Sequence, residues 1–360
     1  MKTKLLCIAL LSLLWIGCRQ KQSDTKDDCE LQTTTLFMEL PDECPTPDGM
    51  AIASNGDLIL ACPNFADPSK PACLMRITAD KQITKWLEVP VLPETGLACP
   101  MGIAFNEKGD LYVCDNQGWS GSKQGKNKGR LLKLVFGKDG KLKETITVAS
   151  GMEHPNGVRV HNGKVYVTQS SLSGILSKEG LLVSGVYRFD ENDVNVKVSN
   201  TENDVSLITT VITHNPQVQY GLDGIVFDKS GNLYVGNFGD GAIHKITFDD
   251  AGNVTGNTIW AQDSEQLTTT DGICMDDAGN MYVADFSVNA IARITPDGVV
   301  KRIAQSPDCD GSDGGLDQPG EPIVWNDKLI ISCFDIVTGP DKVNTKHDRP
   351  YTLAQMELNP

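Results

Sequence analysis

The sequence predicts an all-β fold, a six-bladed β-propeller of four-stranded blades, on three observations. A motif recurs six times at intervals of about 50 residues, and each copy places two short apolar strands around a tight turn. Further apolar strands follow most copies, which gives four strands per unit. Glycine is plentiful, with 34 residues, and alternating apolar and polar runs are typical of many short strands.

The repeat is clearest at Asp223 and Asp271, where Asp-Gly-Ile leads through a turn to Asn-Leu-Tyr-Val and Asn-Met-Tyr-Val. Successive copies start 53, 55, 67, 48 and 50 residues apart. The six starts are Asp48, Met101, Asn156, Asp223, Asp271 and Glu321. A solenoid would need end caps, and the sequence offers none, so the repeat indicates a closed ring.

The ring is expected to close by pairing the two ends of the propeller, which is predicted to span residues 31–360. The sixth copy is followed by a strand near Tyr351–Leu358 but by no fourth strand. We therefore predict that the fourth strand is Gln32–Leu40, ahead of the first copy. Such pairing would leave no open sheet edge.

The N-terminus predicts an exported, lipid-anchored bacterial protein. Two lysines precede an apolar run, Leu5–Ile16, that is too short to span a bilayer, and Gly17-Cys18 then resembles a lipoprotein cleavage site. We expect residues 1–17 to be a signal peptide and 18–30 a tether lipidated at Cys18, with ordinary cleavage near Gly17 as the alternative. The predicted location is the bacterial periplasm or cell envelope, with the anchor as the membrane contact.

The acidic balance of the chain limits its partners. A formal net charge of −15 argues against nucleic acid, because a duplex-binding surface needs clustered lysine and arginine. We expect a monomer whose partner is a small-molecule substrate.

Nine cysteines follow Cys18, and an odd number leaves at least one without a disulfide. Cys62 and Cys73 are candidates for a bridge across a loop. Cys114 and Cys274 lie in apolar strand runs, which favours buried free thiols. The connectivity stays open.

The repeat starts point to a cation site. In a propeller the first strand of each blade lines the channel, so the six starts form a ring, and four of them are carboxylates. Turn preference would also explain the Asp-Gly pairs. It does not explain Asn156, and it does not explain Glu321, which is followed by proline. Carboxylates about 5.5 Å apart repel by roughly 3 kcal/mol at an effective dielectric of about 20, so the ring needs protons or a cation. The oxygen ligands favour Ca²⁺, with Mg²⁺ or Zn²⁺ as alternatives.

At these residues the chain resembles the SMP-30 (regucalcin)/gluconolactonase family of six-bladed propellers, which hold a divalent metal in the channel and often hydrolyse lactones. The resemblance spans about residues 40–340. The family's three metal-ligand motifs match Asn156-Gly157-Val158, Leu222-Asp223-Gly224 and Gly320-Glu321-Pro322. The resemblance implies Asn156, Asp223 and Glu321 as metal ligands, with Asp48 replacing Glu321 if the last match fails.

The resemblance also implies a metal-dependent hydrolase of a lactone or related ester. Asp223 would be the general base, or a ligand only, and Asp271 is an added carboxylate that could serve as base instead. The family's Arg-x-Asn-Asp-Gly segment is Ala98–Gly102 here, without the arginine and asparagine, so a sugar lactone is not expected. The alternative is a non-catalytic, lipid-anchored propeller that binds a sugar or protein ligand over a structural calcium ion.

Polar residues at the ends of the second strands are predicted to rim the channel mouth and to contact substrate. Because each hairpin returns to the face where it began, these residues should lie near the ring, although polar strand ends also occur without function. The predicted substrate contacts are Asn116, Gln169, Asn237, Asp285, Asp335 and His154. The stretch 118–130 is expected to be a loop over the pocket or in solvent, and 308–317 an acidic loop rather than an EF-hand.

Overall fold

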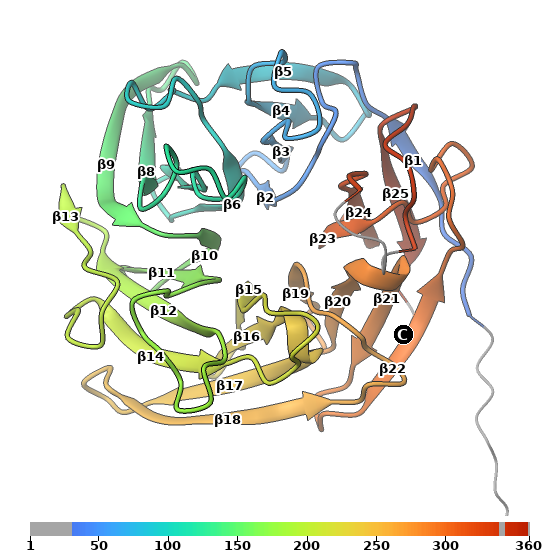
Figure 1. Ribbon diagram of the computed structural model, residues 1–360. Coiled ribbons are helices and arrows are strands. Elements are labelled where there is room, and N and C mark those ends of the chain that lie inside the picture. The colour runs from blue at the N-terminus through green and yellow to red at the C-terminus, as the bar shows by residue number, and fades with distance from the viewer. Residues whose placement is uncertain (1–30, 338–342, 359–360) are drawn as a thin grey trace, which may run out of the picture. The chain divides into compact units, whose positions relative to one another are not determined.

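The computed structural model describes residues 31–337 and 343–358, and these form six antiparallel sheets around a central axis (Figure 1). This confirms the predicted all-β, six-bladed propeller. The predicted signal peptide, tether and lipidated Cys18 lie outside the described residues. Within the described part of the chain, no helix is long and apolar enough to cross a membrane.

Each blade has four strands in order from the channel outwards. The first three blades are β2 (Met50–Ile52), β3 (Leu58–Cys62), β4 (Cys73–Ile77), β5 (Ile83–Glu88); β6 (Pro100–Phe105), β7 (Leu111–Asp115), β8 (Gly129–Phe136), β9 (Leu142–Met152); and β10 (Pro155–His161), β11 (Lys164–Gln169), β12 (Val183–Asp190), β14 (Leu207–Ile212). The next two are β15 (Leu222–Phe227), β16 (Leu233–Asn237), β17 (Ala242–Phe248), β18 (Val254–Gln262); and β19 (Ile273–Met275), β20 (Met281–Asp285), β21 (Ala290–Ile294), β22 (Val300–Gln305). A short extra strand, β13 (Val196–Lys197), pairs with β9.

The hairpin turns are built by local side-chain chemistry. Asp228, at the end of β15, accepts hydrogen bonds on its carboxylate from the backbone N–H of Ser230 and Asn232. Gly231 then takes a φ of +82°, a left-handed conformation that favours glycine. The turn after β19 repeats the device with Asp276 and with Gly279 at a φ of +86°. This recurrence explains why the repeat was visible in the sequence.

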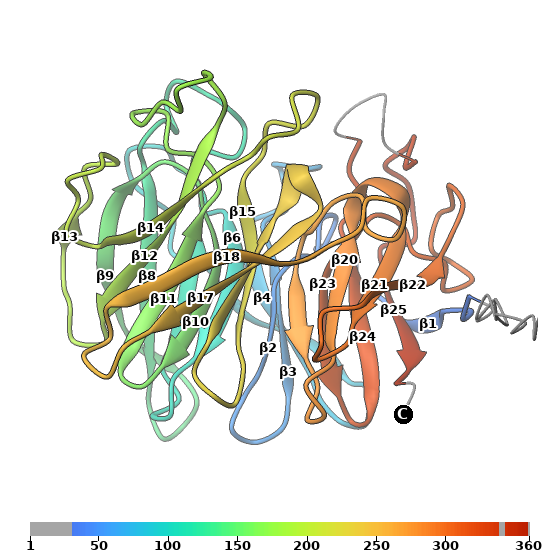
Figure 2. The same ribbon diagram turned by 90° about the horizontal axis from the view of Figure 1, so that it is seen from below.

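The inner strands of neighbouring blades pack backbone to backbone around the channel, along which they run (Figure 2). A Cβ atom added to Gly102 would lie 2.5 Å from the carbonyl oxygen of Asn156, and one added to Gly224 would lie 2.5 Å from that of Asp271. Since no side chain fits there, glycine after the ring position is a requirement of close packing. It brings the six first strands near one another at the axis.

The ring closes in the sixth blade, which joins the two ends of the described chain. Its strands are β23 (Pro319–Trp325), β24 (Lys328–Cys333), β25 (Thr352–Glu357) and β1 (Thr35–Glu39). Thr35 pairs with Gln355 and Glu39 with Thr352, as predicted. Apolar clusters fill the seams between blades. In the seam beside the closing blade, Phe37 of β1 and Trp325 pack edge to face, with their ring centroids 5.9 Å apart.

Candidate active site

The register of the inner strands differs from the predicted ring in the sixth blade, where the ring position lies one residue earlier than predicted. In β10, Pro155 pairs with the last residue of β11, so Asn156 follows at the ring position. In β23, Pro319 pairs with the last residue of β24, so the ring position falls on Gly320. Glu321 takes the next place, which the other five blades fill with glycine. The sixth copy lacks Asp-Gly, and matching its carboxylate to the others shifted the prediction.

Glu321 is paired with Arg159, a cation on β10 that the sequence analysis did not single out. The Glu321 Oε1 atom lies 3.0 Å from Arg159 Nη2, which also donates to the carbonyl oxygen of Ile273 at 3.3 Å. Burial raises the pKa of Glu321, and the guanidinium opposes this rise. Glu321 is not among the residues that line the cavity at the ring. Its part as a metal ligand stays a prediction, whereas its ion pair with Arg159 is shown.

A cavity of about 280 Å³ opens at the ring. Four predicted residues supply its carboxylate and amide oxygens: Asp48, Asn156, Asp223 and Asp271. Its other walls are mostly apolar and aromatic: Met101, Trp119, Val218, Phe238, Phe286 and Phe334, together with Tyr220 and His154. The cavity therefore combines a carboxylate-rich ring with an apolar mouth.

Asn156 is the centre of a hydrogen-bond network at the ring. Its Nδ2 atom donates to Asp223 Oδ2 at 2.7 Å and lies 3.2 Å from the hydroxyl of Tyr220. The same hydroxyl lies 3.4 Å from Nδ1 of His154, and Asn116 Nδ2 lies 3.0 Å from that nitrogen. Burial lowers the pKa of His154 to about 4, so its imidazole is neutral at pH 7. Sequence reasoning found Asn156, Asp223 and His154 but missed Tyr220.

The ring carboxyls hold protons more tightly than ordinary carboxyls. Burial, with the charge of Glu321, raises the pKa of Asp48 to about 8. Burial and the neighbouring ring carboxylates raise the pKa values of Asp223 and Asp271 well above the ordinary range. The physical cause is that like charges cannot all be ionised in one desolvated space. The ring is therefore suited to take up protons or a cation.

We expect the stability of the cation-free protein to fall as pH rises from about 4 to about 8. The carboxyl of Asp48 has an ordinary pKa of 3.8 in the unfolded chain and a pKa of about 8 in the folded protein, so the folded state holds more protons in this window. Thermal unfolding in a chelator across this range measures the slope. Asp48→Asn should make this slope shallower, because the other buried carboxyls with raised pKa values remain. A melting temperature that rises with pH would contradict the prediction.

Aromatic side chains form a collar at the mouth of the cavity. Phe238, Phe286 and Phe334 follow the last residues of β16, β20 and β24, and successive ring centroids lie 5.8 Å apart. Trp119 stacks on Phe65 at 4.0 Å and tilts against Phe334 at 6.2 Å. The predicted loop 118–130 thus contributes Trp119 to the cavity wall. The recurrence of phenylalanine just after three second strands was the signal that could have revealed this collar.

The predicted rim residues do not contact the cavity, with the exception of His154. They are buried, and most of them hold the segments that lead into the first strands, while Asp335 contacts Asn344 and Asp348 ahead of β25. Asp285 accepts hydrogen bonds from the backbone N–H of Thr268 and Thr269 at 2.7 and 2.8 Å, and Gln169 Oε1 accepts from that of Glu153 at 2.8 Å. Gln169, Asn237 and Asp285 end their second strands and turn toward the entering chain, whereas Asn116 is one residue past β7 and Asp335 two residues past β24. The predicted rim residues that are buried and do not line the cavity are Asn116, Gln169, Asn237, Asp285 and Asp335.

Asp335 belongs to a second acidic group outside the ring. Carboxylate oxygens of Asp317, Asp335 and Asp348 lie within 4.8 Å of one another. Burial, with the neighbouring carboxylates, raises the pKa of Asp317 to about 9, and burial raises that of Asp335 to about 7. The segment 308–317 is irregular, as predicted.

The profile of a protein family described as the SMP-30/gluconolactonase/LRE-like region matches residues 74–310. The chain belongs to this family. The match covers most of the propeller and includes three of the ring residues that line the cavity, Asn156, Asp223 and Asp271. Family membership supports a lactonase-like propeller and suggests a divalent metal. No curated protein matches the chain by sequence.

Solved structures of this fold resemble the whole propeller at low sequence identity. A luciferin-regenerating enzyme has a TM-score of 0.60 and 12% identity, covering 90% of this chain and 94% of that one. A gluconolactonase from Xanthomonas campestris has a TM-score of 0.55 and 14% identity, and the alignment covers 92% of this chain and 96% of that one. A calcium-binding regucalcin from Agrobacterium tumefaciens has a TM-score of 0.56 and 13% identity, and the alignment covers 90% of this chain and 94% of that one. At such identities the likeness shows the fold alone.

Proposed function

We propose that this protein is a divalent-cation-dependent hydrolase of a lactone or related ester, with its site at the ring. The observation that carries the proposal is a set of buried carboxyls at the base of a cavity whose mouth is aromatic. Carboxylates of this kind need a compensating charge, and an ester needs both a Lewis acid and a base. The cavity offers groups for each task.

The residues that would hold the cation are Asp48, Asn156, Asp223 and Asp271. All four offer oxygen atoms, which suit a hard ion such as Ca²⁺. The raised pKa values of the three carboxyls among them support this proposal, because these carboxyls hold protons when no cation compensates their charge. The carboxylates of the ring do not converge as closely as those of Asp317 and its partners, which leaves room among them for a substrate oxygen or water.

When bound, the cation would polarise the ester carbonyl and stabilise negative charge on its oxygen. The ionised carboxylate of Asp223 would accept the proton of the attacking water. Asn156 would orient that carboxyl by donating to it, and the Tyr220 hydroxyl contacts the same amide nitrogen of Asn156. Asp271, which also lines the cavity, is the alternative base in this proposal.

The collar indicates the substrate class. Phe238, Phe286, Phe334 and Trp119 offer apolar faces and no charged partner for a polyhydroxylated ring. Met101 occupies the ring position of its blade and adds another apolar surface. We infer that the acyl part of the substrate is apolar, and that its burial against the collar excludes water from the ring.

Titration of metal-stripped protein with Ca²⁺ in a calorimeter tests the cation site. We expect one binding event that Asp223→Ala abolishes, because this substitution removes a central carboxylate and the partner of Asn156. Asp317→Asn is the matched control, since it replaces a buried carboxyl of the second acidic group, outside the ring.

Binding that survives Asp223→Ala and disappears in Asp317→Asn would move the cation site to the second acidic group. The absence of binding at millimolar Ca²⁺ would reject a calcium site at the ring. Glu321→Gln adds a further comparison: loss of binding in this variant would make Glu321 a ligand despite its ion pair with Arg159.

A further inference from the structure

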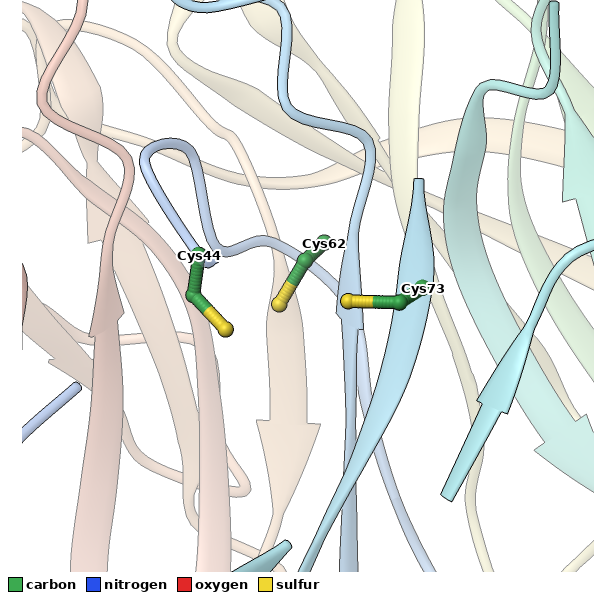
Figure 3. Close-up of side chains that lie close together, drawn as sticks. All are labelled: Cys44, Cys62 and Cys73. Carbon is green, nitrogen blue, oxygen red and sulfur yellow. The ribbon is translucent and has the colours of Figure 1, made fainter. Parts of the chain in front are cut away.

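Three cysteine thiols outside the channel converge on one point. Sulfur atoms of Cys44, Cys62 and Cys73 lie within 4.8 Å of one another, and all three residues are fully buried. Figure 3 shows the three side chains with their sulfur atoms turned toward one another. Cys62 ends β3 and Cys73 begins β4, whereas Cys44 comes from the segment between β1 and β2. Chain folding alone has therefore gathered thiols from three segments.

Local hydrogen bonds hold the three segments together. Cys62 and Cys73 pair directly across the β3–β4 ladder. Asn64, in the loop that connects these strands, donates from Nδ2 to the carbonyl oxygens of Glu43 and Pro71, each at 2.9 Å. Because Glu43 precedes Cys44, this one side chain ties the Cys44 segment to the loop between the other two cysteines. The convergence is thus fixed by contacts independent of the sulfur atoms.

The surroundings favour a soft metal ion. The thioether sulfur of Met75 lies 3.8 Å from the sulfur of Cys73, and among the described residues the group that converges contains neither a carboxylate nor a histidine. Apolar residues of the closing seam enclose it, among them Met50, Leu58 and Tyr351. Thiolate and thioether ligands select soft ions such as Cu(I). A Zn²⁺ ion would need a fourth ligand, whereas the converging group supplies three thiols.

The number of thiols also favours an ion. Any single disulfide among the three would leave the third thiol buried beside it without a partner. One three-coordinate ion engages all three at once, and sulfur atoms bound at about 2.3 Å in a trigonal arrangement lie about 4 Å apart, within the 4.8 Å limit observed here.

We propose that Cys44, Cys62 and Cys73 bind a single Cu(I) ion that fastens the closure of the propeller. Each thiol that coordinates releases its proton to solvent, and the ion keeps its oxidation state. Cys44 follows β1, the outer strand of the closing blade, while Cys62 and Cys73 belong to the first blade. The ion therefore links the strand that closes the ring to the neighbouring blade. Nothing in this role requires the channel site.

The test uses the full-length chain, reduced with a non-thiol reductant and titrated with Cu(I) without oxygen. We expect native mass spectrometry to show one tightly bound ion, with a higher melting temperature for the loaded protein. Cys44→Ser should lose both the tight binding and the stabilisation. Cys114→Ser is the matched control, because Cys114 is also fully buried, on β7, but lies outside the group. It should keep both.

Differential alkylation of the unsubstituted protein covers the case in which Cys44→Ser does not fold. Bound Cu(I) should protect Cys44, Cys62 and Cys73 from a thiol reagent and leave the protection of Cys114 and Cys333 unchanged. The proposal is overturned if Cu(I) does not bind, or if it protects other cysteines instead. It is also overturned if unreduced protein has a mass lower by two hydrogens and the missing thiols map to this group, because a disulfide then occupies the place of the ion.

Discussion

Asp223→Asn is expected to reduce ester or lactone turnover by about 10²–10⁴-fold, the range typical of a lost general base. The substitution keeps the shape of the side chain and one oxygen atom. It removes the charge that would accept a proton from water, while the fold should persist because an amide can still contact Asn156. Steady-state hydrolysis of an apolar lactone in saturating Ca²⁺ measures the effect.

Asp271→Asn is the comparison that assigns the base. Asp271 lines the same cavity as Asp223, and its pKa is also raised by burial and by the neighbouring Asp223. The environments of the two carboxyls are therefore closely matched. If Asp271→Asn loses turnover while Asp223→Asn keeps it, the site is real and the base is Asp271. If the unsubstituted protein hydrolyses none of a broad panel of lactones, aryl esters and organophosphates, the proposed hydrolase is rejected and a binding propeller takes its place.

Phe37→Ala is expected to destabilise the propeller by about 3–5 kcal/mol, as for a buried aromatic residue in a core. Phe37 is the buried side chain of β1, packs against Trp325 at 5.9 Å and carries the Lys81 ammonium 4.5 Å from its ring centroid. Its loss opens the seam where β1 joins the closing blade. Chemical denaturation followed by circular dichroism gives the change in the free energy of unfolding.

Glu39→Ala is the control on the same strand, because Glu39 is exposed and keeps its place in the β1–β25 ladder. Its effect should stay within about 0.5 kcal/mol. Equal destabilisation by the two substitutions would contradict the role given to the Phe37 side chain in the closing seam.

The blades and their closure could be predicted because the information is local. The turns at Asp228 and Asp276 depend on residues two to four positions away, and the left-handed glycines lie within the same few residues. The position of β1 followed from the missing strand after β25. Four ring residues, Asp48, Asn156, Asp223 and Asp271, could be predicted for the same reason, since each is joined to a glycine that must pack against the next blade.

Only the tertiary structure decided which side chains meet across blades. The register of β23 exchanged Glu321 for Gly320 and paired Glu321 with Arg159, which lies 162 residues away in sequence. The pleat at the ends of the second strands sent polar residues inward and set Phe238 and its counterparts at the mouth. Such contacts depend on strand direction and long-range packing, which no local pattern encodes. The meeting of Cys44 with Cys62 and Cys73 has the same origin, because Asn64 holds the Cys44 segment against the loop between the other two cysteines.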